Sequence, residues 1–151
     1  MLYSVFESPI GKIGITTDEK SVLGIDLLTD RTPDKVSSPI AEKAIQELKE
    51  YFSGDRKIFT LAFPIRGTPF KQAVLRAMMT IPYGTTVSYG ELAKMAGKPN
   101  AYRAVGTVCA TNDIPLLIPC HRVIKSDNSI GGFAVRPEIK QQIIDMEKNH
   151  Q

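Results

Sequence analysis

A cysteine and a histidine stand side by side in the run Ile118-Pro119-Cys120-His121-Arg122-Val123. A free thiol has a pKa of about 8.5, so it reacts near neutral pH only where a base or a positive neighbour favours the thiolate. Because adjacent side chains of a strand point to opposite faces, Cys120 and His121 can cooperate only if Pro119 begins a turn. The run therefore predicts a turn that carries a reactive nucleophile, Cys120, beside a candidate base.

Two other kinds of chemistry could use these residues. A thiol hydrolase usually brings its histidine from a distant segment, and the other histidine here, His150, is next to the last residue. A zinc site would need Cys109 and Cys120 with both histidines, in spacings that match no common zinc motif. We expect no metal and no cofactor, and we interpret Cys109 as core packing. A hydrolase that uses Cys120 remains an alternative. Because a hydrolase turns over, the number of reactions per protein molecule would distinguish it from a protein whose cysteine reacts once.

An acidic residue near the end of the chain is expected to face inward. The last predicted helix runs from Pro137 to about Lys148, and Ile139, Ile143 and Glu147 are spaced by four. Residues at this spacing share one face of a helix. A carboxylate on an apolar face needs a partner, so Glu147 is a candidate member of the site.

Two short helices joined by a glycine-containing turn predict a helix-turn-helix. Ser88 and Glu91 form a capping box that begins the first helix. Asn100 is expected to cap the second helix, in which Val105, Val108, Cys109 and Asn112 share a core-facing stripe. Arg103 lies on the opposite face among the small residues Gly106, Thr107 and Ala110, and Lys94 and Lys98 add positive charge. Such a face suits close docking on DNA, although an ordinary helical hairpin is the alternative.

The elements before this region predict a chain of α+β class. Residues 2–7, 12–17 and 22–28 read as an antiparallel meander, Ser38-Pro39 begins a helix, residues 59–65 read as a further strand, and Pro69 opens another helix. We place the boundary after residue 66. Residues 1–66 then form an N-terminal α/β domain, and residues 67–151 form an all-helical C-terminal domain.

The composition excludes several classes of protein. Two cysteines in 151 residues are too few for a disulfide scaffold, and the net charge of +3 permits nucleic-acid binding without demanding it. Neither a signal-like apolar stretch nor a membrane-length apolar run occurs. We expect a soluble protein of the cytoplasm, without a membrane partner.

The run from Ile118 to Val123 resembles the active-site signature of the methylated-DNA–protein-cysteine methyltransferases, also called O6-alkylguanine-DNA alkyltransferases. Other segments resemble the family in order and spacing: Ile81-Pro82-Tyr83-Gly84, Ser88-Tyr89-Gly90, Arg103-Ala104-Val105-Gly106, Asn112 and Gly131-Gly132. The similarity extends from about Pro69 to Glu147. The N-terminal part resembles the family's small ribonuclease-H-like domain only in its order of elements.

The resemblance implies DNA repair by direct reversal. Cys120 would take an alkyl group from O6 of guanine, and also from O4 of thymine, in a suicide reaction that each molecule performs once. Glu147 would orient His121, which would draw the thiol proton through a bridging water. Asn112 would tie the recognition helix to the turn that carries Cys120. Arg122 is expected to pair with a carboxylate and hold that turn.

The resemblance also implies how DNA is bound. The target base must be flipped out of a double-stranded substrate into a pocket. Arg103 would fill the vacated stack, and Tyr89 would crowd the target phosphate and hydrogen-bond the flipped base. The remaining implied contacts are Ala104, Gly106 and Thr107 to DNA, and Val123, Phe133, Ala134 and Val135 around the base. The protein would act as a monomer, associated with the nucleoid if the cell is prokaryotic.

Two further expectations follow from the signature. Val135 stands where the family commonly has glycine, so we expect bulky benzyl adducts to be handled less well than methyl adducts. A non-catalytic DNA-binding module, either a transcription regulator or an alkyltransferase-like lesion sensor, is the rival from another class. Such sensors typically replace the cysteine that is present here as Cys120.

Overall fold

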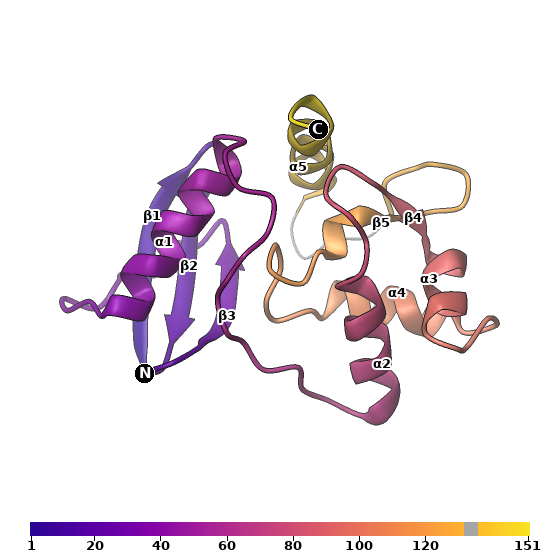
Figure 1. The fold of residues 1–151 in the computed structure, drawn as a ribbon, viewed down its shortest axis with the longest axis horizontal. Coiled ribbons are helices and arrows are strands. Elements are labelled where there is room, and N and C mark those ends of the chain that lie inside the picture. Colours follow the sequence, from indigo (N-terminus) through magenta and orange to yellow (C-terminus); the bar gives the residue numbers. More distant parts are fainter. Residues whose placement is uncertain (132–135) are drawn as a thin grey trace. The chain divides into compact units, whose positions relative to one another are not determined.

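The computed structural model describes residues 1–131 and 136–151, and the chain divides into two compact units (Figure 1). Unit 1 holds Met1–Pro64 together with Asp113–Pro115. Unit 2 holds Ile65–Asn112 and Leu116–Gln151. The boundary predicted after residue 66 does not account for Asp113–Pro115, a segment from the later half of the chain that joins unit 1. That segment is held at the sheet, where the Ile25 amide donates to the Asp113 carbonyl at 3.0 Å.

Unit 1 is an antiparallel meander covered by one helix. The strands β1 (Leu2–Ser8), β2 (Gly11–Thr17) and β3 (Val22–Leu27) lie in that order, as predicted. Helix α1 (Pro39–Phe52) lies along one face of the sheet, and Ser38 caps it by accepting from the Ala41 amide. Alternate sheet residues such as Ile13 and Ile15 are fully buried, as is Leu48 of α1.

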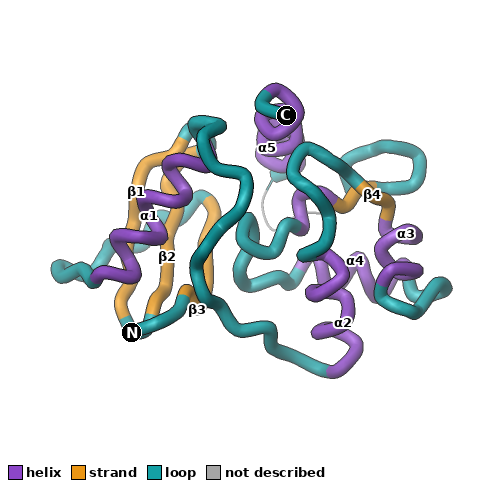
Figure 2. The backbone as a smooth tube through the Cα atoms, in the orientation of Figure 1, coloured by secondary structure: helices purple, strands orange, loops and turns teal. Residues whose placement is uncertain are grey.

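The strand predicted at residues 59–65 is wrong. The chain between α1 and α2 forms no strand and is drawn as loop in Figure 2. The Thr60 amide donates to Glu47 Oε1 of α1 at 2.8 Å, so a side chain takes the hydrogen bond that a ladder would have used. One main-chain bond, from the Val22 amide to the Ala62 carbonyl, reaches β3. Pro64 then lacks the amide that a continued ladder would need.

Unit 2 is mostly helical. It contains α2 (Pro69–Met78), α3 (Tyr89–Met95), α4 (Tyr102–Ala110), a single 3-10 turn η1 (Cys120–Arg122) and α5 (Pro137–Asn149). The prediction of an all-helical domain is wrong in one respect, because β4 (Val87–Ser88) and β5 (Val123–Ile124) pair in parallel. This pairing joins the residue before Tyr89 to the strand that follows the Cys120 turn.

The predicted pair of short helices, α3 and α4, is present. Ser88 accepts from the Glu91 amide at 3.0 Å, and its own amide donates to Glu91 Oε1 at 3.1 Å, which confirms the capping box. The cap predicted at Asn100 is wrong. The helix begins one residue later, with Ala101 as its N-cap, whose carbonyl accepts from the Val105 amide and whose methyl side chain cannot accept a hydrogen bond. Within the described residues, no helix combines the length and hydropathy that a membrane span needs.

Candidate active site

The turn that carries Cys120 follows from Pro119. The Arg122 amide donates to the Pro119 carbonyl at 3.0 Å, which closes the 3-10 turn of η1 and confirms the turn predicted there. Cys120 is 1% exposed and His121 is fully buried. The apolar run before the turn, Leu116-Leu117-Ile118, is buried as well and anchors it. The thiol and the imidazole therefore lie inside unit 2, away from bulk water.

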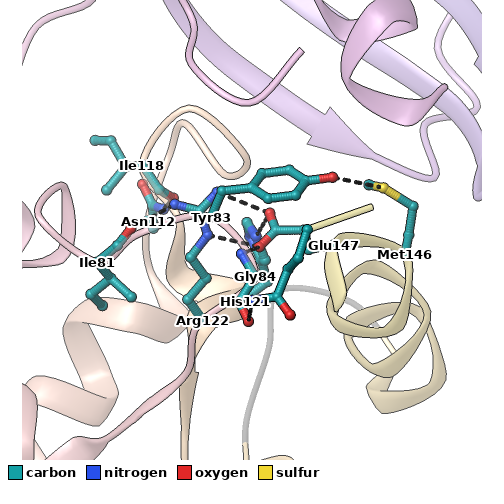
Figure 3. A network of polar contacts seen from close by, with 10 residues as sticks. Ile81, Tyr83, Gly84, Asn112, Ile118, His121, Arg122, Met146 and Glu147 are labelled. Carbon is teal, nitrogen blue, oxygen red and sulfur yellow. Dashed lines mark hydrogen bonds and ion pairs between the residues drawn. The ribbon is translucent and has the colours of Figure 1, made fainter. Parts of the chain in front are cut away.

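His121 and Glu147 are in direct contact. His121 Nε2 lies 2.7 Å from Glu147 Oε2, although the two residues come from η1 and from the last turn of α5 (Figure 3). An ionised carboxylate accepts hydrogen bonds and donates none, so Nε2 must carry the proton. The neutral ring then keeps its lone pair on Nδ1. This tautomer makes His121 a base through Nδ1 and gives Glu147 the part of orienting it.

Glu147 is held by more than the histidine. Arg122 donates from Nε to Oε1 at 2.9 Å and from Nη2 to Oε2 at 3.0 Å, while its Nη1 donates to the Ile81 carbonyl at 2.8 Å (Figure 3). The Gly84 amide adds a bond to Oε1 at 3.0 Å. The acid expected to face inward is therefore 1% exposed and has partners on both oxygens. Arg122 pairs with a carboxylate as expected and ties the turn to α5.

These contacts settle the charges of the pair. Burial alone would raise the pKa of Glu147, but the hydrogen bonds from His121 and Arg122, together with the positive charge of Arg122, outweigh burial and hold the pKa far below its usual range. Burial lowers the pKa of His121 below 6.5, against the opposing effect of Glu147. At neutral pH the carboxylate is thus ionised and the imidazole is neutral, which is the state that can accept a proton.

Asn112 connects the end of α4 to the Cys120 turn. Its Nδ2 donates to the Ile118 carbonyl at 2.9 Å, and its side chain also hydrogen-bonds the Cys120 sulfur. Burial raises the pKa of Cys120, and the Asn112 bond works in the opposite direction. The resting group is therefore a thiol, so a base must remove its proton when the reaction occurs.

Lys140 is a functional candidate that the sequence analysis missed. It is fully buried in α5, and its Nζ donates to the carbonyls of Val123 at 2.6 Å and of Ile130 at 2.7 Å. Burial lowers its pKa, and its positive charge lowers the pKa of Cys120. The spacing could have revealed it, because Lys140 precedes Glu147 by seven residues, which is two helical turns on the same face.

Tyr89 stands between the buried site and the surface. Lys140 Nζ lies 5.7 Å from the centre of its ring. Gly131 lies against the hydroxyl end of the Tyr89 ring, since a Cβ atom at Gly131 would come within 2.7 Å of the hydroxyl oxygen. The φ angle of Gly131, +74°, also favours glycine. Any larger residue at 131 would displace the Tyr89 ring.

The residues predicted to contact DNA lie along the outer side of α4. Arg103, Ala104 and Thr107 are exposed and Gly106 is half-buried, opposite the buried Val105, Val108 and Cys109. A hollow of about 660 Å³ opens beside them. Its lining residues are Tyr89, Gly90, Tyr102, Arg103, Gly106, Lys125, Ser126 and Asp127. The structure thus brings Tyr89 and Arg103 to one surface depression.

Four predicted pocket residues divide into two groups. Val123 is buried, and its carbonyl is the one that binds Lys140. Phe133, Ala134 and Val135 lie outside the described residues, so the expectation about the width of the pocket at Val135 stays a prediction.

Comparison with known proteins covers nearly the whole chain. Residues 1–65 match the domain described as 6-O-methylguanine DNA methyltransferase, ribonuclease-like domain, and residues 69–149 match 6-O-methylguanine DNA methyltransferase, DNA binding domain. A methylated-DNA–protein-cysteine methyltransferase of Methanosarcina barkeri is 38% identical, with 99% of each chain covered. The constitutive one of Bacillus subtilis is 36% identical over 97% of this chain and 94% of its own. A crystal structure of Mycobacterium tuberculosis OGT in complex with DNA superposes with a TM-score of 0.89 at 33% identity, covering 98% of this chain and 93% of that one.

Proposed function

The chain belongs to the 6-O-methylguanine DNA methyltransferase family, and from that premise we propose that it repairs DNA by direct reversal. In the proposed reaction Cys120 removes an alkyl group from O6 of guanine, and from O4 of thymine, in double-stranded DNA. The observation that carries the proposal is the buried contact of His121 Nε2 with Glu147, 2.7 Å long, which leaves Nδ1 as the basic nitrogen beside a cysteine.

The chemical step is a displacement at the alkyl carbon. The thiol proton of Cys120 passes to His121 Nδ1 through a bridging water, and the sulfur attacks the carbon as its bond to O6 breaks. The electron pair of that bond stays with the guanine, and the proton held by His121 passes on through solvent to the purine, so the products are a thioether and ordinary guanine. The imidazolium formed at His121 is stabilised by the negative charge of Glu147. The product thioether offers no good leaving group, so each protein molecule acts once.

DNA must deliver the base to a thiol that is 1% exposed. A base inside a duplex is out of reach, so it is flipped, at a cost of a few kcal/mol. Arg103 is exposed on α4 and fills the stack that the base leaves, while the small neighbours Ala104, Gly106 and Thr107 let the helix approach the duplex closely. Tyr89 lines the hollow between this face and Lys140, where it meets the flipped nucleotide.

The remaining parts of the proposal concern the state of the protein in the cell. We take the active form to be a monomer, since all the site residues described above belong to unit 2 of one chain. Its substrate places it with the nucleoid in the cytoplasm if the cell is prokaryotic. No cofactor enters the reaction, because the alkyl group moves directly from oxygen to sulfur.

The test is to mix the protein with a duplex that carries one O6-methylguanine and to measure the intact protein mass. We expect a gain of about 14 Da on one protein molecule per lesion, as a covalent cysteine adduct requires. Cys120→Ala should abolish the gain. Cys109→Ala is the matched control and should keep it, because burial raises the pKa of the Cys109 thiol to about 12.

Each competing outcome has its own signature in this experiment. Repeated turnover with release of the methyl group as methanol would identify a thiol hydrolase. Tight binding of the damaged duplex without any adduct would identify a lesion sensor. Either result would overturn the proposal of alkyl transfer.

A further inference from the structure

Tyr102 is the residue of α4 whose exposure the proposed mechanism does not use. Its side chain is 51% exposed, although tyrosine is large and mostly apolar. Apart from Arg103, the other exposed residues of the helix are small: Ala104, Thr107 and Ala110. An aromatic ring in the first turn of a DNA-facing helix offers a bound nucleotide a large and rigid apolar contact area.

The helix places Tyr102 on the side that faces Tyr89. Tyr102 and Gly106 are four residues apart and so share one row of α4. Gly106 faces Tyr89, since a Cβ atom at Gly106 would lie 3.9 Å from Cε1 of that ring. The two tyrosines and Gly106 all line the hollow of about 660 Å³, a volume in the range of small-molecule sites. The hollow is therefore bounded by two aromatic rings with a glycine between their elements.

Arg103, the next residue, is in contact with this ring. Its guanidinium carbon lies 5.8 Å from the centre of the Tyr102 ring, within the range of a cation–π interaction. When Arg103 enters a duplex to fill the stack, it must leave that position. The ring face that the guanidinium occupied is then open to whatever part of the nucleotide lies in the hollow.

The burial of Cys120 indicates which part of the flipped nucleotide meets Tyr102. The base must travel inward, because its target, Cys120, is 1% exposed. The deoxyribose stays outside, attached to the strand, at the depth of a half-exposed side chain. Aromatic rings supply apolar surface for nucleotides and are common in sites that hold unpaired strands.

We propose that Tyr102 is a second DNA-contacting side chain of α4, whose ring packs against the deoxyribose of the extruded nucleotide at the mouth of the hollow. This proposal rests on the proposed function. Tyr102 acts as a positioning residue, because it holds the nucleotide and does not touch the reacting atoms.

The experiment compares three substrates in single-turnover reactions: free O6-methylguanine base, a single-stranded oligonucleotide with one O6-methylguanine, and the same strand in a duplex. Tyr102→Ala should slow both oligonucleotides about tenfold, which corresponds to about 1.4 kcal/mol. The free base has no deoxyribose, so its rate should be unchanged. Tyr102→Phe keeps the ring and should react like the wild type.

Two comparison variants sharpen the result. Met95→Ala removes another exposed apolar side chain, 45% exposed on the neighbouring helix α3, and should change no rate. Arg103→Ala should slow the duplex alone, because only a duplex has a stack to fill. Thermal unfolding should show the same midpoint for Tyr102→Ala and the wild type, since the side chain is half exposed.

The outcomes that overturn the proposal are distinct. Slowing of the free base by Tyr102→Ala would put the ring against the base, and slowing of the duplex alone would make it a support for Arg103. A loss in Tyr102→Phe equal to that in Tyr102→Ala would assign the effect to the hydroxyl group, and unchanged rates in Tyr102→Ala would remove the residue from the site. If the wild type reacts with none of the three substrates, the proposed function itself fails.

Discussion

Arg122 binds Glu147 with two arms of its guanidinium group, from Nε to Oε1 at 2.9 Å and from Nη2 to Oε2 at 3.0 Å. This fork leaves the carboxylate ionised although it is 1% exposed, and it compensates the charge that would otherwise protonate His121. The neutral state of the candidate base thus depends on an arginine that does not face the thiol.

Arg122→Met should therefore damage both stability and the pH profile. Removing one partner of a buried ion pair costs about 3–5 kcal/mol. The positive charge of Arg122 is among the causes that lower the pKa of His121, after burial, so its loss should raise that pKa and shift the alkyl-transfer rate profile to higher pH. Urea unfolding and single-turnover rates at a series of pH values from about 5 to 8, which brackets the reference pKa of about 6.5, measure the two effects. Arg76→Met, at an exposed position in the last turn of α2, is the control; an unshifted profile would contradict the link.

The stability of the protein should fall on acidification in two stages. Folding lowers the pKa of His121 from 6.5 and of Glu147 from 4.5, so in both ranges the unfolded chain binds more protons than the folded one. The contribution of the two groups to the free energy of unfolding is therefore complete above pH 6.5. At lower pH the free energy of unfolding decreases by up to about 1.4 kcal/mol per pH unit for each group. Urea unfolding at a series of pH values checks this. His121→Gln should remove the first stage, and a constant free energy from neutral to acidic pH would refute the prediction.

Lys140→Met should weaken the thiol chemistry and loosen the Val123 strand. Two carbonyl groups, of Val123 and Ile130, lose their donor, at about 1–3 kcal/mol for each buried group left unsatisfied. The pKa of Cys120 should rise because the ammonium charge that lowers it is gone, so the rate at neutral pH should drop and recover partly in alkaline buffer. Lys148→Met, exposed in the last turn of the same helix, provides the control. An equal loss of rate at every pH would show that Lys140 has only a structural role.

Arg103→Ala should separate base flipping from chemistry. Repair of a duplex should slow, because the vacated stack is left unfilled, while the reaction with a free base analogue should keep its rate. Single-turnover rates on the two substrates measure this, with Arg76→Ala, at an exposed position of α2, as the comparison that should change neither rate. Equal slowing with both substrates would show that Arg103 acts in the base pocket and not by filling the vacated stack.

Local patterns in the sequence were enough for most elements and for a reactive cysteine on a turn, whereas the alkyl-transfer chemistry came from the family resemblance. The meander at residues 2–28 follows from short alternating runs and turn residues, and the capping box at Ser88 and Glu91 from two side chains three residues apart. The adjacency of Cys120 and His121, with Pro119 before them, predicted the turn. The inward direction of Glu147 came from helical spacing alone. In each case the determining interactions lie within a few residues of one another.

The tertiary structure decided what depends on distant partners. Residues 59–65 have the composition of a strand, yet the carboxylate of Glu47 takes the Thr60 amide and no ladder forms. Asp113–Pro115 joins unit 1, where the Asp113 carbonyl accepts from the Ile25 amide of β3, and β4 pairs with β5 across more than thirty residues. No periodicity within either segment reveals these contacts. Lys140 looked like an ordinary helix lysine until the carbonyls of Val123 and Ile130 were brought to its ammonium group. Whether a polar side chain of a helix becomes part of a site depends on the groups that folding brings into contact with it. Those groups come from other parts of the chain.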